Sequence, residues 1–125
     1  MKRMLGFAAL LTLAVLALTV GLDAADAPPA KRLVSGEVVS LYGYVAQGLH
    51  GADHRDAGVF QAEKRGLPLA ILEDGTGDLY IAVYKGATSA VPKLAPFMGV
   101  KVNAQGPVWS RRGLNLIEIE VVAEQ

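Results

Sequence analysis

Both histidines of the chain lie in one short segment, GLHGADHRDAG, at residues 48–58. His50 and His54 are four residues apart, and Asp53 lies between them. Two imidazoles and a carboxylate are the donors of an open three-ligand zinc or copper site, provided that the chain brings them together. Three glycines make a helix unfavourable here. We therefore expect a polar, solvated loop whose aspartates cap the next helix, and we keep zinc or copper binding by these three residues as the alternative.

Arginines form the second group of candidate ligand-binding residues. Arg111 and Arg112 lie in a short turn, SRRG, and Arg55 belongs to the histidine segment. A guanidinium group can hold a carboxylate or a phosphate through two parallel hydrogen bonds. Arginines in turns also occur simply as solvated residues, so an anion site and a plain polar turn stand as alternatives.

Aromatic residues form the third group. Tyr42, Tyr44 and Trp109 fall in segments with strand character, and rings exposed on strands can stack against sugars or single-stranded bases. Tyr80 and Tyr84 share one face of another such segment. The competing interpretation is that these rings fill the core or the rim of a small β domain. We assign Tyr42, Tyr44 and Trp109 to a candidate ligand-binding face, together with the histidine loop and the arginines.

Catalytic and nucleic-acid functions find little support. The chain has no cysteine, which excludes disulfides, thiol nucleophiles and thiolate metal sites. It has no serine elbow, phosphate-binding glycine loop or zinc-protease motif. Lys plus Arg and Asp plus Glu number 12 each, so the basic surplus of a nucleic-acid-binding protein is missing. We expect neither an enzyme nor a nucleic-acid partner.

The N-terminus has the layout of a secretory signal. Lys2 and Arg3 precede an apolar run at 4–22, after which small and polar residues return. We expect a signal peptide at 1–24 with cleavage after Ala24, a flexible lead-in at 25–31 and one domain at 32–125. The apolar run is long enough to span a bilayer, so an uncleaved anchor in the inner membrane is the alternative. In both cases the domain is expected outside the cytoplasm, periplasmic or secreted.

Period-two patterns and turn residues predict the elements that position the candidate side chains. The segment RLVSGEVVSLYGYV alternates over its whole length and predicts one long strand bent at its glycines. The turn DGTGD between two β-branched and aromatic runs predicts a hairpin. The predicted strands are 32–45, 67–73, 79–85, 100–109 and 114–123, and the predicted short helices are 59–65 and 87–99, the second capped by Ser89. A bulge is predicted at Gly106, and Ile117, Ile119 and Val121 are predicted to face inward.

This order of three strands, a helix and two strands indicates a fold. It is the order of the five-stranded Greek-key barrel called the OB-fold, whose first strand is long and bent and whose helix lies between strands three and four. We therefore expect a mainly β fold, an OB-fold-like barrel with one or two short helices. An open five-stranded sheet or a sandwich is the alternative.

A resemblance supports this fold. The segments SGEVVSLYGY, GLPLAILEDGTGDLYIAV and MGVKVNAQGPVWSRRGLNLIEIEVV resemble the small exported OB-fold proteins of bacteria, in which one such barrel follows a signal peptide. Some proteins of that group carry cysteines at the end of strand one and in the loop after a histidine, and here Gly43 and Ala57 stand near those places. No redox or thiolate-metal role is therefore carried over.

The resemblance also indicates where a ligand would bind. In this fold the loops between strands one and two and between strands four and five flank the binding face, and here they are 48–58 and 110–113. We predict an exported, non-catalytic binding module without a cofactor, for a protein, a peptide or a small anionic ligand of the cell envelope. The alternatives are a metal-binding or metal-responsive protein built on the histidine loop, and a structural accessory subunit of an envelope complex. Membrane contact is expected only through an uncleaved N-terminal segment.

Overall fold

The computed structural model describes residues 29–125. The predicted signal peptide, its cleavage point and the first part of the lead-in lie outside the described residues. The strands are β1 (Ala30–Ser40), β2 (Leu69–Glu73), β3 (Leu79–Tyr84), β4 (Thr88–Ser89), β5 (Lys101–Arg111), β6 (Leu114–Ile119) and β7 (Val121–Glu124). The helices are α2 (Leu41–Gln47), α3 (Arg55–Arg65) and α4 (Val91–Leu94), with 3-10 helices at Ala52–His54 and Ala95–Phe97.

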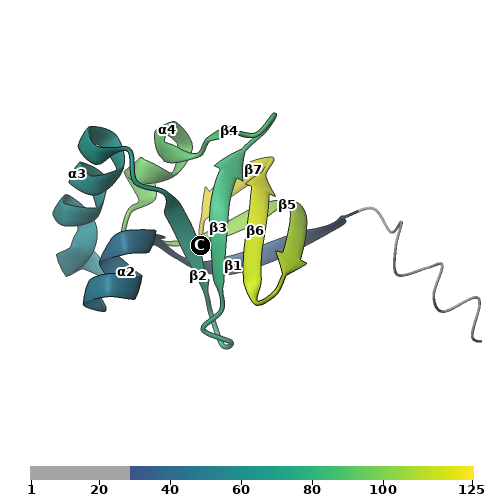
Figure 1. Cartoon of the computed structure of the whole chain (residues 1–125), viewed down its shortest axis with the longest axis horizontal. Coiled ribbons are helices and arrows are strands. Elements are labelled where there is room, and N and C mark those ends of the chain that lie inside the picture. The colour runs from purple at the N-terminus through teal and green to yellow at the C-terminus, as the bar shows by residue number, and fades with distance from the viewer. Residues whose placement is uncertain (1–28) are drawn as a thin grey trace, which may run out of the picture.

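Five strands close into a barrel in the order β1-β2-β3-β6-β5, and β5 pairs back with β1 (Figure 1). The β3–β6 pair is parallel and the other pairs of the barrel are antiparallel. The short strand β4 pairs with β3, and the short strand β7 pairs with β5, both antiparallel. With α4 lying between β3 and β5 in the chain, this is the connectivity of an OB-fold-like barrel. The predicted fold class is confirmed.

A glycine allows β1 to serve two neighbours. Residues 30–37 of β1 pair with β5 and residues 36–40 pair with β2, so Gly36 and Glu37 pair with both neighbours. A Cβ atom at Gly36 would overlap the carbonyl oxygen of Leu72. Only a residue without a side chain lets the two strands approach this closely.

The core fills the barrel with aliphatic side chains from every strand that closes it. Val34 and Val38 of β1, Ile71 of β2 and Ile117 and Ile119 of β6 have no measurable exposure. Leu94 and Met98 close one end of the barrel, because α4 and the residues after it insert their apolar side chains there. Burial of such side chains stabilises the fold by roughly 1.5–3 kcal/mol each.

The predicted long strand at 32–45 is wrong in its second half. β1 ends at Ser40, and the next seven residues form α2. The Ser40 hydroxyl accepts a hydrogen bond from the Gly43 amide, and Gly48 ends the helix in the left-handed conformation. A serine at the N-cap and a glycine after the last turn are strong helix boundaries, and they override the period-two pattern.

The predicted loop at 48–58 is also partly wrong, because α3 begins at Arg55 and contains Gly58. That glycine is buried, and a Cβ atom there would lie 2.7 Å from the sulfur of Met98. The close packing of α3 on the core therefore compensates for the low helix propensity of glycine. No aspartate side chain caps α3.

Four smaller predictions also need correction. Ala30 and Lys31, predicted as flexible lead-in, pair with β5. The β1–β5 register runs without interruption through Gly106, so no bulge interrupts that pairing. Val121 is 61% exposed rather than inward-facing, because the chain turns at Glu120 to begin β7. The described residues hold three α-helices instead of one or two. Within residues 29–125, no helix is long and apolar enough to cross a membrane.

Candidate functional site

His54 is part of the core and not of a solvated loop. Its side chain is 1% exposed, and its Nε2 accepts a hydrogen bond of 3.0 Å from the backbone amide of Ser40. A Cβ atom at Gly43 would lie 2.6 Å from its Cε1 atom. The imidazole therefore fixes the junction of β1 and α2 from inside.

Burial also decides the charge of this histidine. Desolvation lowers the pKa of His54 below its usual value, the exposed His50 lowers it further, and the carboxylate of Glu37 acts in the opposite direction. Because Nε2 accepts a hydrogen bond, the neutral ring carries its proton on Nδ1. That Nδ1 is buried without a hydrogen-bond partner among the described residues.

The predicted metal ligands are not brought together. Asp53 and His50 are exposed, whereas His54 is buried. The lone pair on Nε2 of His54, which a metal ion would need, already accepts a hydrogen bond from the Ser40 amide. In the described part of the chain, no group of three His, Asp or Glu side chains could hold a metal ion. His50 instead meets the ring of Tyr44 edge-on at 6.5 Å between centroids. The zinc or copper set predicted as the alternative does not form.

A hollow with a volume of about 680 Å³ lies between α2 and the barrel. We call it the α2 groove. Helix α2 forms one wall with Leu41, Tyr42, Val45 and Ala46. The floor consists of Leu79 and Ile81 from β3 and of Leu114 and Asn115 from β6, and Gly77, Asp78 and Gly113 come from the two turns that lie together at this end of the barrel (Figure 1). The groove is therefore mainly apolar.

A second hollow, of about 390 Å³, continues the α2 groove along the outside of the barrel. It shares Ile81, Leu114 and Asn115 with the groove. We call it the tryptophan hollow, and its remaining lining is Trp109, Arg111, Arg112 and Leu116. Ile81 pairs with Leu116, and Leu116 pairs with Trp109 across the sheet. One row of apolar side chains therefore crosses three strands.

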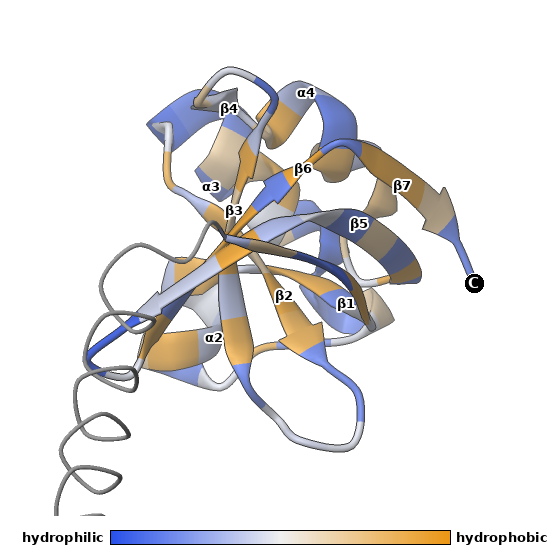
Figure 2. Ribbon diagram, turned by 90° about the vertical axis from the view of Figure 1, so that its right-hand side faces the viewer, coloured by the Kyte–Doolittle hydropathy of each residue, from blue (hydrophilic) through white to orange (hydrophobic). Residues whose placement is uncertain are grey.

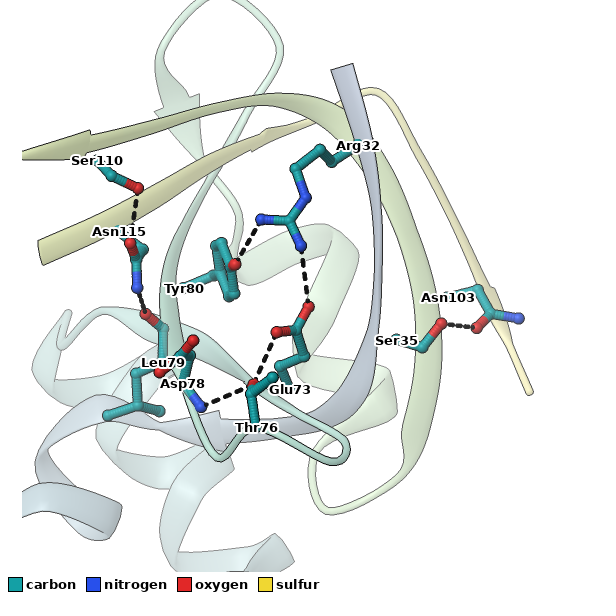
Figure 3. A network of polar contacts seen from close by, with 10 residues as sticks. All are labelled: Arg32, Ser35, Glu73, Thr76, Asp78, Leu79, Tyr80, Asn103, Ser110 and Asn115. Carbon is teal, nitrogen blue, oxygen red and sulfur yellow. Dashed lines mark hydrogen bonds and ion pairs between the residues drawn. The ribbon is translucent and has the colours of Figure 1, made fainter. Parts of the chain in front are cut away.

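Polar contacts hold the floor and the turns of this face (Figure 3). The side-chain nitrogen of Asn115 donates to the carbonyl of Leu79 at 3.2 Å. The Ser110 hydroxyl donates to the side-chain oxygen of Asn115 at 2.7 Å. The Thr76 hydroxyl binds the Glu73 carboxylate and accepts from the Asp78 amide. These bonds fix both strands and the β2–β3 turn where they border the groove.

An arginine closes the same network on the other side of the hairpin. Arg32 donates to the Tyr80 hydroxyl at 2.7 Å and contacts the Glu73 carboxylate at 3.4 Å (Figure 3). Tyr80 is 3% exposed, so it is a core residue and not a stacking platform. The hairpin that borders the groove is therefore tied to β1 as well as to its own turn.

The structure separates the predicted binding residues into two sets. Tyr42, Trp109, Arg111 and Arg112 line the continuous face formed by the α2 groove and the tryptophan hollow. Tyr44, His50 and Arg55 do not, and Arg55 donates to the carbonyl of Pro96 at 3.3 Å. The loop between the first two strands does flank the candidate site, but through α2 rather than through 48–58.

Sequence reasoning missed several lining residues, above all Val45, Leu79, Ile81 and Leu114. Val45 is 66% exposed and Leu114 is 67% exposed. Leu41, Tyr42 and Val45 have the three- and four-residue spacing of one helix face. That spacing is the available signal for a helix, but the same residues also fit the alternation of a strand.

Comparison with known proteins adds no identity. No protein-family model matches the chain, and no curated protein matches it.

Proposed function

We propose that this protein is a non-catalytic binding module of the cell envelope, and that the α2 groove holds an apolar segment of a protein partner. The signal-like N-terminus supports export, since Lys2 and Arg3 precede an apolar run at 4–22. The OB-fold-like barrel supports binding, because this fold uses the face next to its first and last loops for ligands. Fold alone does not decide the ligand.

One observation carries the proposal: large apolar side chains are exposed together on one face. Of the eight exposed large apolar residues of residues 29–125, four line the α2 groove or the tryptophan hollow, namely Tyr42, Val45, Trp109 and Leu114. Exposed apolar patches that are rimmed by polar residues mark interaction sites. Figure 2 shows hydrophobic stretches within the α2 ribbon.

The chemistry of the lining favours a protein segment over other ligands. The α2 groove offers few side-chain hydrogen-bonding groups, chiefly those of Asp78, Asn115 and Tyr42. A sugar would need many more such groups. A nucleic acid would need a row of cations, whereas this face carries only Arg111 and Arg112.

The test is selection from a random peptide library displayed on phage. The bait is the chain from Ala25 onward, which contains the whole described barrel. We expect the selected peptides to share apolar residues and to lose binding by about tenfold or more to Leu114→Asp, because a buried carboxylate replaces an apolar contact.

The matched control is Leu33→Asp. Leu33 is 61% exposed, close to the 67% of Leu114, but it lies on β1 outside both hollows. Equal loss of binding in both variants, or selected peptides without apolar residues, would contradict the proposal. Thermal unfolding of both variants separates loss of binding from loss of fold.

A further inference from the structure

The tryptophan hollow differs from the α2 groove in charge. Two cations, Arg111 and Arg112, line it beside the exposed ring of Trp109. The charged side chain that lines the α2 groove is the carboxylate of Asp78. One continuous apolar face therefore has a cationic end.

These two guanidinium groups are not engaged within the described part of the protein. The three ion pairs found in residues 29–125 are Lys31–Glu120, Arg32–Glu73 and Lys101–Asp74. None of the side-chain hydrogen bonds found in residues 29–125 involves Arg111 or Arg112. Guanidinium donors next to an apolar surface are suited to a carboxylate that arrives with apolar neighbours.

The position of Arg112 provides a second observation. Arg112 has φ of 50° and Gly113 has φ of 83°, and together they form the two-residue turn between β5 and β6. Such a turn strongly prefers Asn, Asp or Gly at its first position. Arginine there is locally unfavourable, because a left-handed backbone crowds its Cβ. The turn thus carries a cation at the cost of its own stability.

Two bare glycines favour a peptide over a lipid as the carrier of that carboxylate. Gly77 and Gly113 line the α2 groove, and a Cβ atom at either position would meet nothing within 4 Å. The Gly77 amide donates to the carbonyl of Glu73 at 3.1 Å, whereas the Gly77 carbonyl and the Gly113 backbone take part in no turn hydrogen bond found in the described residues. These remaining groups are open to hydrogen bonds with an extended main chain. An acyl chain has no groups that could use them.

We propose that the partner segment is an acidic-apolar peptide, whose apolar side chains occupy the α2 groove and whose carboxylate is bound by Arg111 and Arg112. This inference rests on the proposed function. It adds the charge of the partner segment, its orientation along the face, and the two arginines that recognise its carboxylate.

The experiment compares matched peptides on matched variants. Peptides selected on the wild-type chain are resynthesised with each Glu or Asp replaced by Gln or Asn, and both forms are measured by fluorescence anisotropy. We expect the acidic form to bind about tenfold more tightly than the amide form. We expect that difference to vanish in the Arg111→Gln/Arg112→Asn double variant and to shrink with added salt.

The charge control is Lys64→Gln/Lys93→Gln, which removes two exposed cations outside the α2 groove and the tryptophan hollow. This variant retains the preference for the acidic peptide. Thermal unfolding supplies an independent readout, since Arg112→Asn places a preferred residue in the turn and raises the Tm of the single variant.

The outcomes separate this inference from the proposed function. If acidic and amide peptides bind equally and Leu114→Asp abolishes both, the proposed function stands and the carboxylate inference is overturned. If no peptide is selected, both are overturned. If vesicles of anionic phospholipid bind in an arginine-dependent manner while the acidic peptides do not, the carboxylate inference is overturned in favour of a lipid headgroup.

Discussion

At the scale of single residues, His54 makes stability depend on pH. The buried ring has a pKa below its ordinary value of 6.5, mainly because of desolvation. The unfolded chain therefore takes up a proton before the folded chain does as the pH falls. The stabilisation is complete above about pH 6.5 and is lost progressively below it, until the pKa of the folded state is passed.

We expect the free energy of unfolding, measured by urea titration, to fall between about pH 7 and pH 5. His54→Gln removes this titration and flattens that part of the profile. His50→Gln is the control, because it removes the exposed ring and leaves the buried one in place. A profile that stays steep in His54→Gln would show that another group causes the slope.

At the scale of elements, α2 depends on its first residue. The Ser40 hydroxyl caps the Gly43 amide and donates to the Gln61 side chain of α3 at 2.5 Å. Ser40→Ala removes both bonds, and we expect it to destabilise the protein by about 1–2 kcal/mol. Hydrogen exchange of the α2 amides should accelerate, because the helix has only seven residues.

Ser35→Ala is the matched control for α2. The Ser35 hydroxyl donates to Asn103 at 2.6 Å in the middle of β1 and caps no helix (Figure 3). This variant should lose stability without faster exchange in α2. The same exchange in both variants would mean that the cap does not hold the groove wall.

At the scale of the whole molecule, barrel closure requires a close approach at Gly106. This glycine is buried where β5 changes its neighbour from β7 to β6. A Cβ atom there would overlap the carbonyl oxygen of Glu118, and backbone cannot move aside as a side chain can. We expect Gly106→Ala to lower the free energy of unfolding by about 1–3 kcal/mol or more, measured through Trp109 fluorescence.

Gln105→Ala tests the neighbouring position of β5, which is exposed. It should leave the unfolding midpoint almost unchanged. A similar loss in both variants would point to the β propensity of the strand rather than to the closure of the barrel.

The strands of the barrel could be predicted because alternation and turn residues are local signals. Four of the five predicted strands, including the hairpin around DGTGD, agree with β2, β3, β5 and β6. The remaining prediction, the first strand at 32–45, is wrong after Ser40, because LYGYVAQG fits the residue spacing of both a strand and a helix. The Ser40 cap and the packing of His54 against Gly43 decide in favour of the helix.

By itself the sequence determined the barrel, the balance of charge and the absence of thiol chemistry, and it predicted a candidate site near the first and last turns. Only the tertiary structure decided which residues form that place. It buried His54, turned Tyr44 towards His50, and joined α2, β3 and β6 into one groove. These segments are far apart in the chain, so local periodicity carries no information about their meeting, which depends on how the closed barrel packs.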